Sequence, residues 1–141
     1  NAAVQLGYKV TGNINVDELP SVWNNLYKKY LDIDVPSDSL GVLQDIHWSH
    51  GSFGYFPTYT LGSFYAAQFY NQASSEISNI NSKMENGDTK ELLEWLRNNI
   101  HRHGERYDAK DLCKRITGEE LNFKYFMDYA KSKYSKIYNL D

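Results

Sequence analysis

Residues 41–59 carry the side chains of this sequence that are best suited to chemistry. The segment combines three glycines with an amide, a carboxylate, two imidazoles and two phenols: Gly41, Gly51, Gly54, Gln44, Asp45, His47, His50, Tyr55 and Tyr59. Glycine lets backbone approach a ligand closely, and histidine and tyrosine can donate hydrogen bonds to developing negative charge. We therefore interpret the segment as one wall of an active site.

His47 is the central candidate of this segment. Asp45 precedes it by two residues and Gln44 by three, so on a helical turn His47 can project into a cavity while Asp45 or Gln44 forms local hydrogen bonds. A satisfied core histidine beside a capping Asp45 explains the same pattern equally well. Tyr55 and Tyr59, four residues apart, would share a helical face and could donate to an oxyanion. Ordinary core tyrosines account for their spacing at least as well.

A self-contained metal site or a nucleophile is less well supported. His47 and His50 are three residues apart and His101 and His103 are two apart, but neither pair forms the His-Glu-x-x-His motif that places two zinc ligands on one helical face. We interpret His101 and His103 as a solvated turn after a helix. The sequence also lacks the Gly-x-Ser-x-Gly pattern of a serine nucleophile.

The elements that must position these residues are predicted to be helices. Apolar spacing predicts helices over residues 18–31, 37–46, 57–83 and 121–138. Asp17 would cap the first of these, and Pro57 would begin the third. Two further helices are predicted, one that begins with the capping box Asp88–Glu91 and a short one from Asp108 to about Gly118. We assign no structure to residues 1–12 and expect residues 47–56 to be partly irregular. No segment alternates as a half-buried strand does, so the predicted fold class is all-α, an irregular helical bundle.

The composition limits the class of protein. The 141 residues suit one helical domain over 1–141, and with 41% hydrophobic residues the chain can build a core. A net charge of −3 excludes the basic face of a nucleic-acid binder, and no apolar run is long enough for a membrane span. Twelve tyrosines favour polar cavities and interfaces over a dry core. Cys113, the sole cysteine, is interpreted as a buried structural thiol, and with no signal peptide apparent we expect a cytoplasmic location.

The same segment resembles a known family of enzymes. Gly41-Val-Leu-Gln44-Asp45-Ile-His47-Trp48, followed by Phe53 to Gly62, is similar to the C-terminal region of the carboxypeptidase Taq family of zinc metallocarboxypeptidases. The similarity continues through Tyr65-Ala-Ala-Gln68, Trp95-Leu96, Ile100-His101 and Thr117-Gly118-Glu119, and covers about residues 13–140. Residues 1–12 do not resemble the family.

The resemblance implies a fold and an activity. The family is all-helical, with a deep zincin-like groove, and removes single residues from the C-termini of peptides. Its zinc ligands and general base lie upstream of the matched region, so the resemblance assigns no metal ligand to this chain and places zinc only in the intact enzyme. It implies that His47 and one of the tyrosines line the substrate groove and help to hold the substrate or its oxyanion. From this we predict catalytic roles for His47, Tyr59 and Tyr55, and substrate-binding roles for Gln44, Asp45, Trp48 and His50.

Our hypothesis from sequence is therefore the C-terminal portion of a metallocarboxypeptidase, forming one wall of the groove and inactive alone. Its expected partners are a peptide substrate and the missing N-terminal portion, while homodimerisation stays open. Because the chain begins with Asn, we expect it to be a processed product or a piece of a longer protein. A non-catalytic helical module that binds peptides or proteins is the alternative, and a small metal-binding protein that uses His47 and His50 is a third hypothesis.

Overall fold

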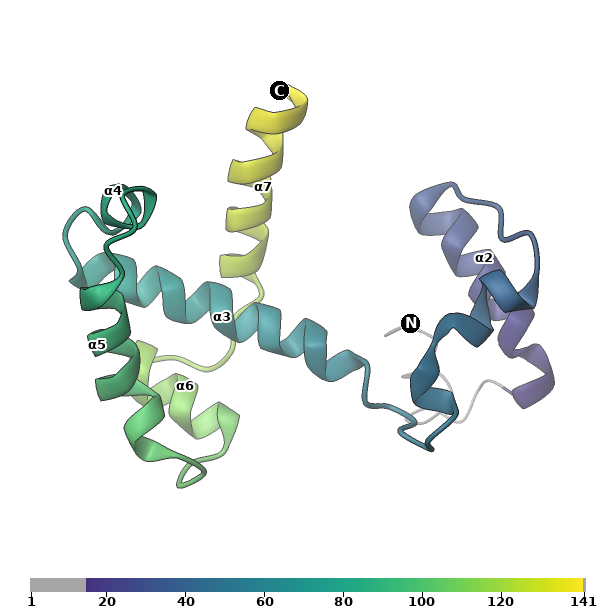
Figure 1. Cartoon of the computed structure of the whole chain (residues 1–141), viewed down its shortest axis with the longest axis horizontal. Helices are drawn as coiled ribbons and strands as arrows, with labels where there is room; N and C mark the ends of the chain where they lie inside the picture. Colours follow the sequence, from purple (N-terminus) through teal and green to yellow (C-terminus); the bar gives the residue numbers. More distant parts are fainter. Residues whose placement is uncertain (1–14, 141) are drawn as a thin grey trace. The chain divides into compact units, whose positions relative to one another are not determined.

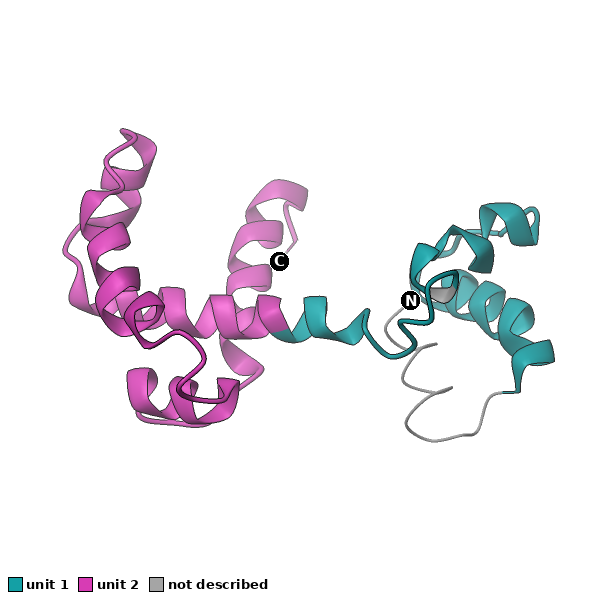
Figure 2. Ribbon diagram, turned by 60° about the horizontal axis from the view of Figure 1, so that its bottom comes forward, with its two compact units in different colours: residues 1–61 teal, residues 62–141 magenta. Residues whose placement is uncertain are grey.

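The computed structural model describes residues 15–140, except for the side chain of Trp48. Helices make up the described chain, which contains no strand, as the sequence predicts (Figure 1). The helices divide between two compact units, residues 1–61 and 62–141, and the boundary falls within one helix (Figure 2). That the chain forms a single domain stays a prediction. Among the described residues, no helix is both long enough and apolar enough to cross a membrane.

Unit 1 is built around helix α2, Leu19–Leu31. Leu19 and Trp23 on α2 pack with Val42 to form its buried core, and Trp23 stacks on Tyr27 with 5.1 Å between ring centroids. This confirms the helix predicted at 18–31. One detail of the prediction was wrong: Asp17 is not the cap, because it lies within a preceding 3-10 turn, η2 (Val16–Glu18).

The segment before the site is a series of 3-10 turns, where a short α-helix over 37–46 was predicted. The turns are η3 (Asp38–Leu40), η4 (Val42–Gln44) and η5 (Ile46–Trp48). They are separated by Gly41 and Asp45, whose backbone angles are not helical. Gly41 is packed so closely that an added Cβ would lie 2.6 Å from Cγ1 of Val35. Packing of the chain against Val35 therefore overrides the local helical pattern.

Helix α3, Pro57–Glu76, begins at the predicted proline but ends before the predicted residue 83. The chain breaks at residues 77–79, where Asn79 adopts a left-handed conformation, and resumes as α4, Ile80–Glu85. Ile77 and Ile80 are both buried against Trp95, which lies on α5, Lys90–Asn99. The indole nitrogen of Trp95 donates to Oε2 of Glu76 at 2.6 Å.

The other elements of unit 2 follow their local signals more closely. After α5 come a 3-10 turn, η6 (His101–His103), then α6, Ala109–Thr117, and α7, Lys124–Tyr138. Asp108 caps α6 by accepting from the backbone N–H of Asp111 at 2.8 Å, and Gly118 ends it with φ = 81°. At α5 the side chain of Asp88 accepts from the backbone N–H of Lys90 at 3.3 Å, while Thr89, the residue before the helix, makes no capping hydrogen bond. Trp95 is buried and Leu92, Leu96 and Ile100 pack in the same cluster, whereas Leu93 is exposed.

Gln68 explains why α7 begins at Lys124 rather than at 121. It is buried on α3, with 1% of its surface exposed. Its Nε2 donates to Oγ1 of Thr117 and to the carbonyl of Glu120, both at 3.1 Å, and its Oε1 accepts from the backbone N–H of Asn122 at 2.8 Å. These bonds hold the segment after α6 extended against α3.

Candidate functional site

Asp45 is the residue that orients His47. It is 3% exposed and lies between the turns η4 and η5, in an extended conformation. Its Oδ1 accepts from the backbone N–H of His47 at 3.0 Å and lies 2.6 Å from Nδ1 of the same residue. The carboxylate thus caps η5 and holds the imidazole with one oxygen.

This contact determines the tautomer of His47. A carboxylate only accepts hydrogen bonds, so Nδ1 of His47 must carry the proton that it shares with Asp45. Nε2 is then left for a different partner. It accepts a hydrogen bond when the ring is neutral and donates one when the ring is protonated. Asp45 is buried and bonds to His47. That it also binds substrate stays a prediction.

Four aromatic rings surround the His47 ring and form what we call the His47 cluster: Tyr55, Phe56, Tyr59 and His50 with His47 itself. The ring centroids lie 5.5 Å from His47 for Tyr55, which stacks on it, 5.6 Å for Phe56 and His50, and 6.0 Å for Tyr59. The Tyr55 and Tyr59 rings also meet each other edge to face at 5.5 Å. The predicted catalytic residues His47, Tyr55 and Tyr59 are thus brought together.

Two glycine turns make this gathering possible. Gly51 and Gly54 have φ of 77° and 82°, values that residues with a side chain rarely adopt. They fold residues 49–56 back so that Tyr55 and the first turn of α3 reach His47. Tyr55 and Tyr59 remain 49% and 54% exposed, so both phenols can reach a ligand. Within residues 15–140 the Tyr55 hydroxyl has no hydrogen-bond partner.

The other predicted substrate-binding residues lie in different settings. Nε2 of the exposed Gln44 donates to the carbonyl of Ser39 at 2.5 Å, so this amide supports the turns before the site. His50 is exposed, and its Nδ1 lies 2.9 Å from Oγ of Ser52. The side chain of Trp48 lies outside the described part of the structure. Sequence reasoning had not assigned Phe56 to the site, although its place between two tyrosines of an aromatic-rich segment was a usable signal.

The described residues do not form a metal site of their own. No group of three or more His, Cys, Asp or Glu side chains within residues 15–140 is arranged to hold a metal ion. His47 and His50 are therefore two imidazoles without a third such ligand among the described residues.

The second histidine pair lies in unit 2, where η6 joins α5 to the loop before α6. His101 is exposed, as predicted, but His103 is half-buried against the Tyr107 ring at 5.4 Å. Burial, with the charges of Arg102, Arg115 and Arg106, lowers the pKa of His103. Arg102 and Arg115 lie near the C-terminal ends of α5 and α6, where cations offset the helix dipoles. A structural role accounts for this cluster.

Comparison with known proteins identifies the family. The family model described as Carboxypeptidase Taq (M32) metallopeptidase matches residues 8–134. This chain belongs to that family. The match includes every residue of the His47 cluster and confirms the resemblance found in the sequence.

Individual relatives agree with the Carboxypeptidase Taq assignment. Carboxypeptidase 1 of Bacillus subtilis is 42% identical over 130 residues, which are 92% of this chain and 26% of that protein. Thermostable carboxypeptidase 1 of Thermus thermophilus is 38% identical over 127 residues, 90% of this chain and 25% of its own length. This chain thus spans about a quarter of the length of the curated relatives it matches.

Solved structures of the family share this fold. The M32 carboxypeptidase of Deinococcus radiodurans superimposes with a TM-score of 0.89 at 32% identity, covering 98% of this chain and 28% of that one. Metallocarboxypeptidase 1 of Trypanosoma cruzi gives a TM-score of 0.86 at 35% identity, covering 94% of this chain and 29% of that one. The all-α prediction is thereby confirmed.

Proposed function

We propose that this chain is the C-terminal, substrate-groove part of a Carboxypeptidase Taq metallocarboxypeptidase that removes single residues from the C-termini of peptides. The observation that carries the proposal is the Asp45–His47 pair, with Tyr55 and Tyr59 gathered around it. A buried carboxylate that orients an imidazole beside two exposed phenols is a set of donors suited to an oxyanion. The family match supports the reaction class.

The metal belongs to the intact enzyme. Zinc, when bound there, would act as a Lewis acid on the scissile carbonyl and lower the pKa of its water. We propose that its ligands come from the part of the polypeptide that this chain does not span, because residues 15–140 offer no group of three suitable side chains. Only the steps assigned to residues of this chain are derived below.

His47 and a phenol act on the carbonyl oxygen of the peptide bond being cleaved. As that oxygen gains negative charge, a protonated Nε2 of His47 and a hydroxyl of Tyr55 or Tyr59 donate to it. Because Asp45 engages Nδ1, the ring cannot rotate away from this direction without losing a hydrogen bond to a buried carboxylate. Donors held in place before reaction stabilise the transition state more than mobile ones.

The remaining polar residues of the segment position the peptide. His50 is exposed beside His47, and its ring is available to the bound peptide. We keep Gln44 and Trp48 as substrate-binding candidates. Gln44 would act by stabilising the turns through Ser39.

The test is His47→Ala, with Asp45→Asn beside it, in the intact enzyme. We expect His47→Ala to lower kcat by about 100-fold, the cost typical of one lost oxyanion donor, with little change in KM. Because the variant also leaves the buried Asp45 without its ring partner, the melting temperature should fall, but turnover should fall much more than stability. Asp45→Asn should lower kcat less, shift the pH profile of kcat and change the tautomer that 15N NMR reports for His47. An unchanged kcat with a lowered melting temperature for both variants would instead make His47 a core histidine.

A further inference from the structure

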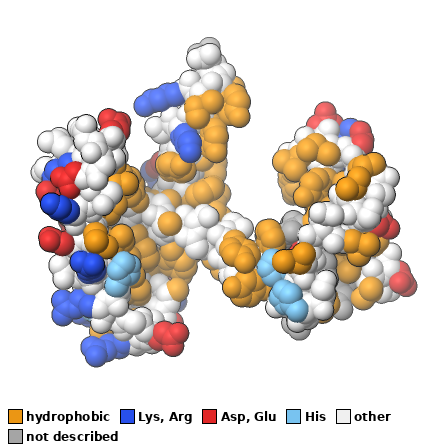
Figure 3. Space-filling model, viewed as in Figure 1, with side chains coloured by type: hydrophobic (Ala, Val, Ile, Leu, Met, Phe, Trp, Pro, Cys, Tyr) orange, Lys and Arg blue, Asp and Glu red, His pale blue; other side chains and the backbone are white. Residues whose placement is uncertain are grey.

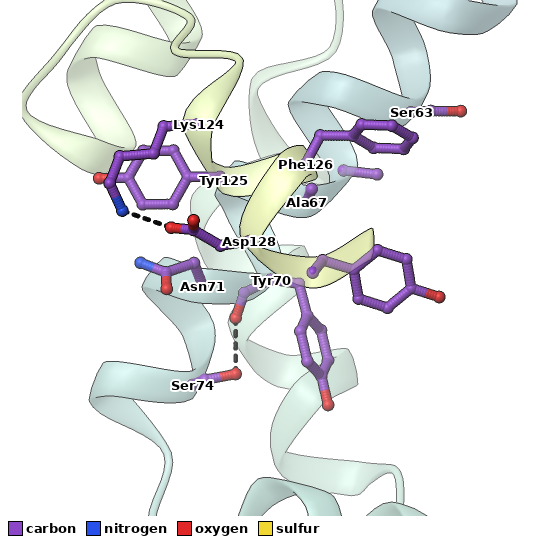
Figure 4. Close-up of a pocket in the computed structure, with 11 residues that line it drawn as sticks. Ser63, Ala67, Tyr70, Asn71, Ser74, Lys124, Tyr125, Phe126 and Asp128 are labelled. Atoms are coloured by element: carbon purple, nitrogen blue, oxygen red, sulfur yellow. Dashed lines mark hydrogen bonds and ion pairs between the residues drawn. The ribbon is translucent and has the colours of Figure 1, made fainter. Parts of the chain in front are cut away.

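A groove between α3 and α7 in unit 2 has no role in the proposed chemistry. It has a volume of about 640 Å³, and Figure 4 shows its lining side chains converging from the two helices. The lining residues on α3 are Ser63, Ala66, Ala67, Tyr70, Asn71 and Ser74, and those on α7 are Lys124, Tyr125, Phe126, Asp128 and Tyr129. None of them belongs to the His47 cluster.

Many side chains that line the groove are polar, but the surface they leave for a ligand is mainly apolar. Most of its polar groups already have partners within the chain. The Tyr70 hydroxyl donates to Asn81 and the Ser74 hydroxyl to the Tyr70 carbonyl, at 2.8 Å and 2.7 Å. Lys124 pairs with Asp128, as the dashed line in Figure 4 shows.

The two phenols on α7 are engaged as well. The Tyr125 hydroxyl donates to Glu119, and the Tyr129 hydroxyl accepts from Lys133 at 3.1 Å. A ligand in the groove would therefore meet mainly methyl groups and ring faces. Such a surface favours an apolar occupant over a polar peptide or a charged small molecule.

The shape of the α3 face indicates which apolar occupant fits. Its lining residues recur at intervals of three and four along the helix, so they form one face, and all but Tyr70 are small. A face of small side chains lets another helix approach to the 8–10 Å separation typical of helix pairs. The apolar surface continues along α7, where Tyr129, Tyr134 and Ile137 are exposed (Figure 3).

We propose that this groove receives a helix from the part of the Carboxypeptidase Taq polypeptide that this chain does not span. The curated relatives are about four times as long as the segment they share with this chain, so most of their sequence lies outside it and is available to cover this face. A helix of the same polypeptide is present at a high effective concentration, and it would exclude a second copy of the chain from the groove. The groove is thus an interface inside the complete enzyme.

The inference rests on family membership and not on the proposed catalytic role. It is tested by chemical protection of cysteines, which needs no activity. Ala67→Cys places a thiol in the groove. Ser75→Cys is the matched control, because Ser75 is exposed on the same helix but does not line the groove. Cys113, the natural cysteine, is fully buried and gives a low background.

Each variant is labelled with a maleimide in two contexts: the 141-residue chain, and Carboxypeptidase 1 of Bacillus subtilis with its matched 130 residues replaced by this chain. Peptide mapping by mass spectrometry follows each cysteine separately. We expect Cys at 67 to react at least tenfold more slowly in the chimera than in the isolated chain, while Cys at 75 reacts equally fast in both.

Two results would overturn the proposal. One is a folded chimera in which the cysteine at 67 reacts as fast as in the isolated chain. The other is protection in the isolated chain that grows with its concentration, which would make a second copy the occupant. Should the chimera not fold, the same cysteine at the aligned position of the intact Bacillus enzyme gives the same decision.

Discussion

At the scale of single residues, the buried carboxylate of Asp45 determines the orientation of the His47 ring. Asp45 is followed by an imidazole two residues later, a spacing that is compatible both with substrate binding and with a local cap. The structure shows the local contact, with one oxygen serving both the backbone and the ring of His47. Asp45 thus orients His47, and the rings of Tyr55 and Tyr59 are exposed beside it.

The two tyrosines can be separated by removing one hydroxyl at a time. We expect only one of the two tyrosines to act as a donor in the intact enzyme. Replacing that tyrosine with Phe should lower kcat by 10- to 100-fold at constant KM, since a donor acting only in the transition state contributes about 1–3 kcal/mol. Replacing the second tyrosine with Phe should change kcat less than threefold. Steady-state kinetics on both variants, with Tyr30→Phe as an exposed control outside the cluster, assigns the donor. Wild-type kcat in both would remove the phenols from the mechanism.

Cys113 gives a prediction about pH. Burial raises the pKa of its thiol, so above the ordinary thiol pKa the unfolded chain loses this proton before the folded chain does. The folded state then binds more protons than the unfolded state, and stability falls as pH rises. We expect the free energy of unfolding to decline more steeply above about pH 8.5 in wild type than in Cys113→Ala, measured by urea titration at several pH values. Parallel curves would contradict this.

At the scale of elements, local signals located most helices but not their interruptions. Asp108 and Gly118 bound α6 as predicted, because a cap and a left-handed glycine act within one turn. The break at 77–79 adjoins residues that pack on Trp95, and the 3-10 turns at 38–48 include Gly41, which is packed closely against Val35. Helical periodicity continues through both places and therefore predicted helices there.

Two glycines make a matched test of this distinction. Gly41→Ala should lower the free energy of unfolding by about 1–3 kcal/mol, because its Cβ would lie 2.6 Å from Val35 Cγ1 and 3.2 Å from the Ser37 carbonyl. Gly62→Ala lies within α3 with no atom near the added Cβ, and should raise stability by about 0.5–1 kcal/mol. Thermal and urea unfolding of the 141-residue chain check both signs. Equal effects would mean that the turn at Gly41 can adjust.

Gln68 makes a second test at this scale. Replacing it with Ala leaves the Thr117 hydroxyl, the Glu120 carbonyl and the Asn122 N–H without these partners, and should cost about 2–4 kcal/mol. The side chain of Gln72, on the same helix, donates to Glu76 one turn away, so Gln72→Ala should cost less than about 0.5 kcal/mol. Urea unfolding measures both, and similar small losses would show that the segment before α7 is not held by Gln68.

At the scale of the whole molecule, the chain spans about a quarter of the length of the curated relatives it matches. It carries a complete Asp45–His47 pair but no group of three metal ligands among residues 15–140. Apolar side chains on α7 and in the groove are exposed to a degree that suits a covered interface better than a free surface.

These features predict that the isolated chain has no carboxypeptidase activity. The pure 141-residue chain, supplied with excess zinc and a blocked peptide substrate, should release no C-terminal residue above a no-enzyme control, and metal analysis after gel filtration should find no bound zinc. The intact Bacillus relative is the positive control. Turnover by the isolated chain that a chelator abolishes would disprove this prediction.

The sequence by itself determined the helical class, the family and the residues of the candidate site. These depend on local signals: caps and stops act within a turn, and the Gln44-Asp45-x-His47-Trp48 motif is contiguous. Tertiary structure alone decided that Asp45 serves His47, that Phe56 joins the cluster, that α3 ends at Glu76 and that Gln68 delays α7 to Lys124. The physical reason is the separation of the partners along the sequence. Gln68 bonds to a residue 54 positions away, and Ile77 packs on Trp95. No local pattern encodes such pairings, because only packing in three dimensions brings the partners together.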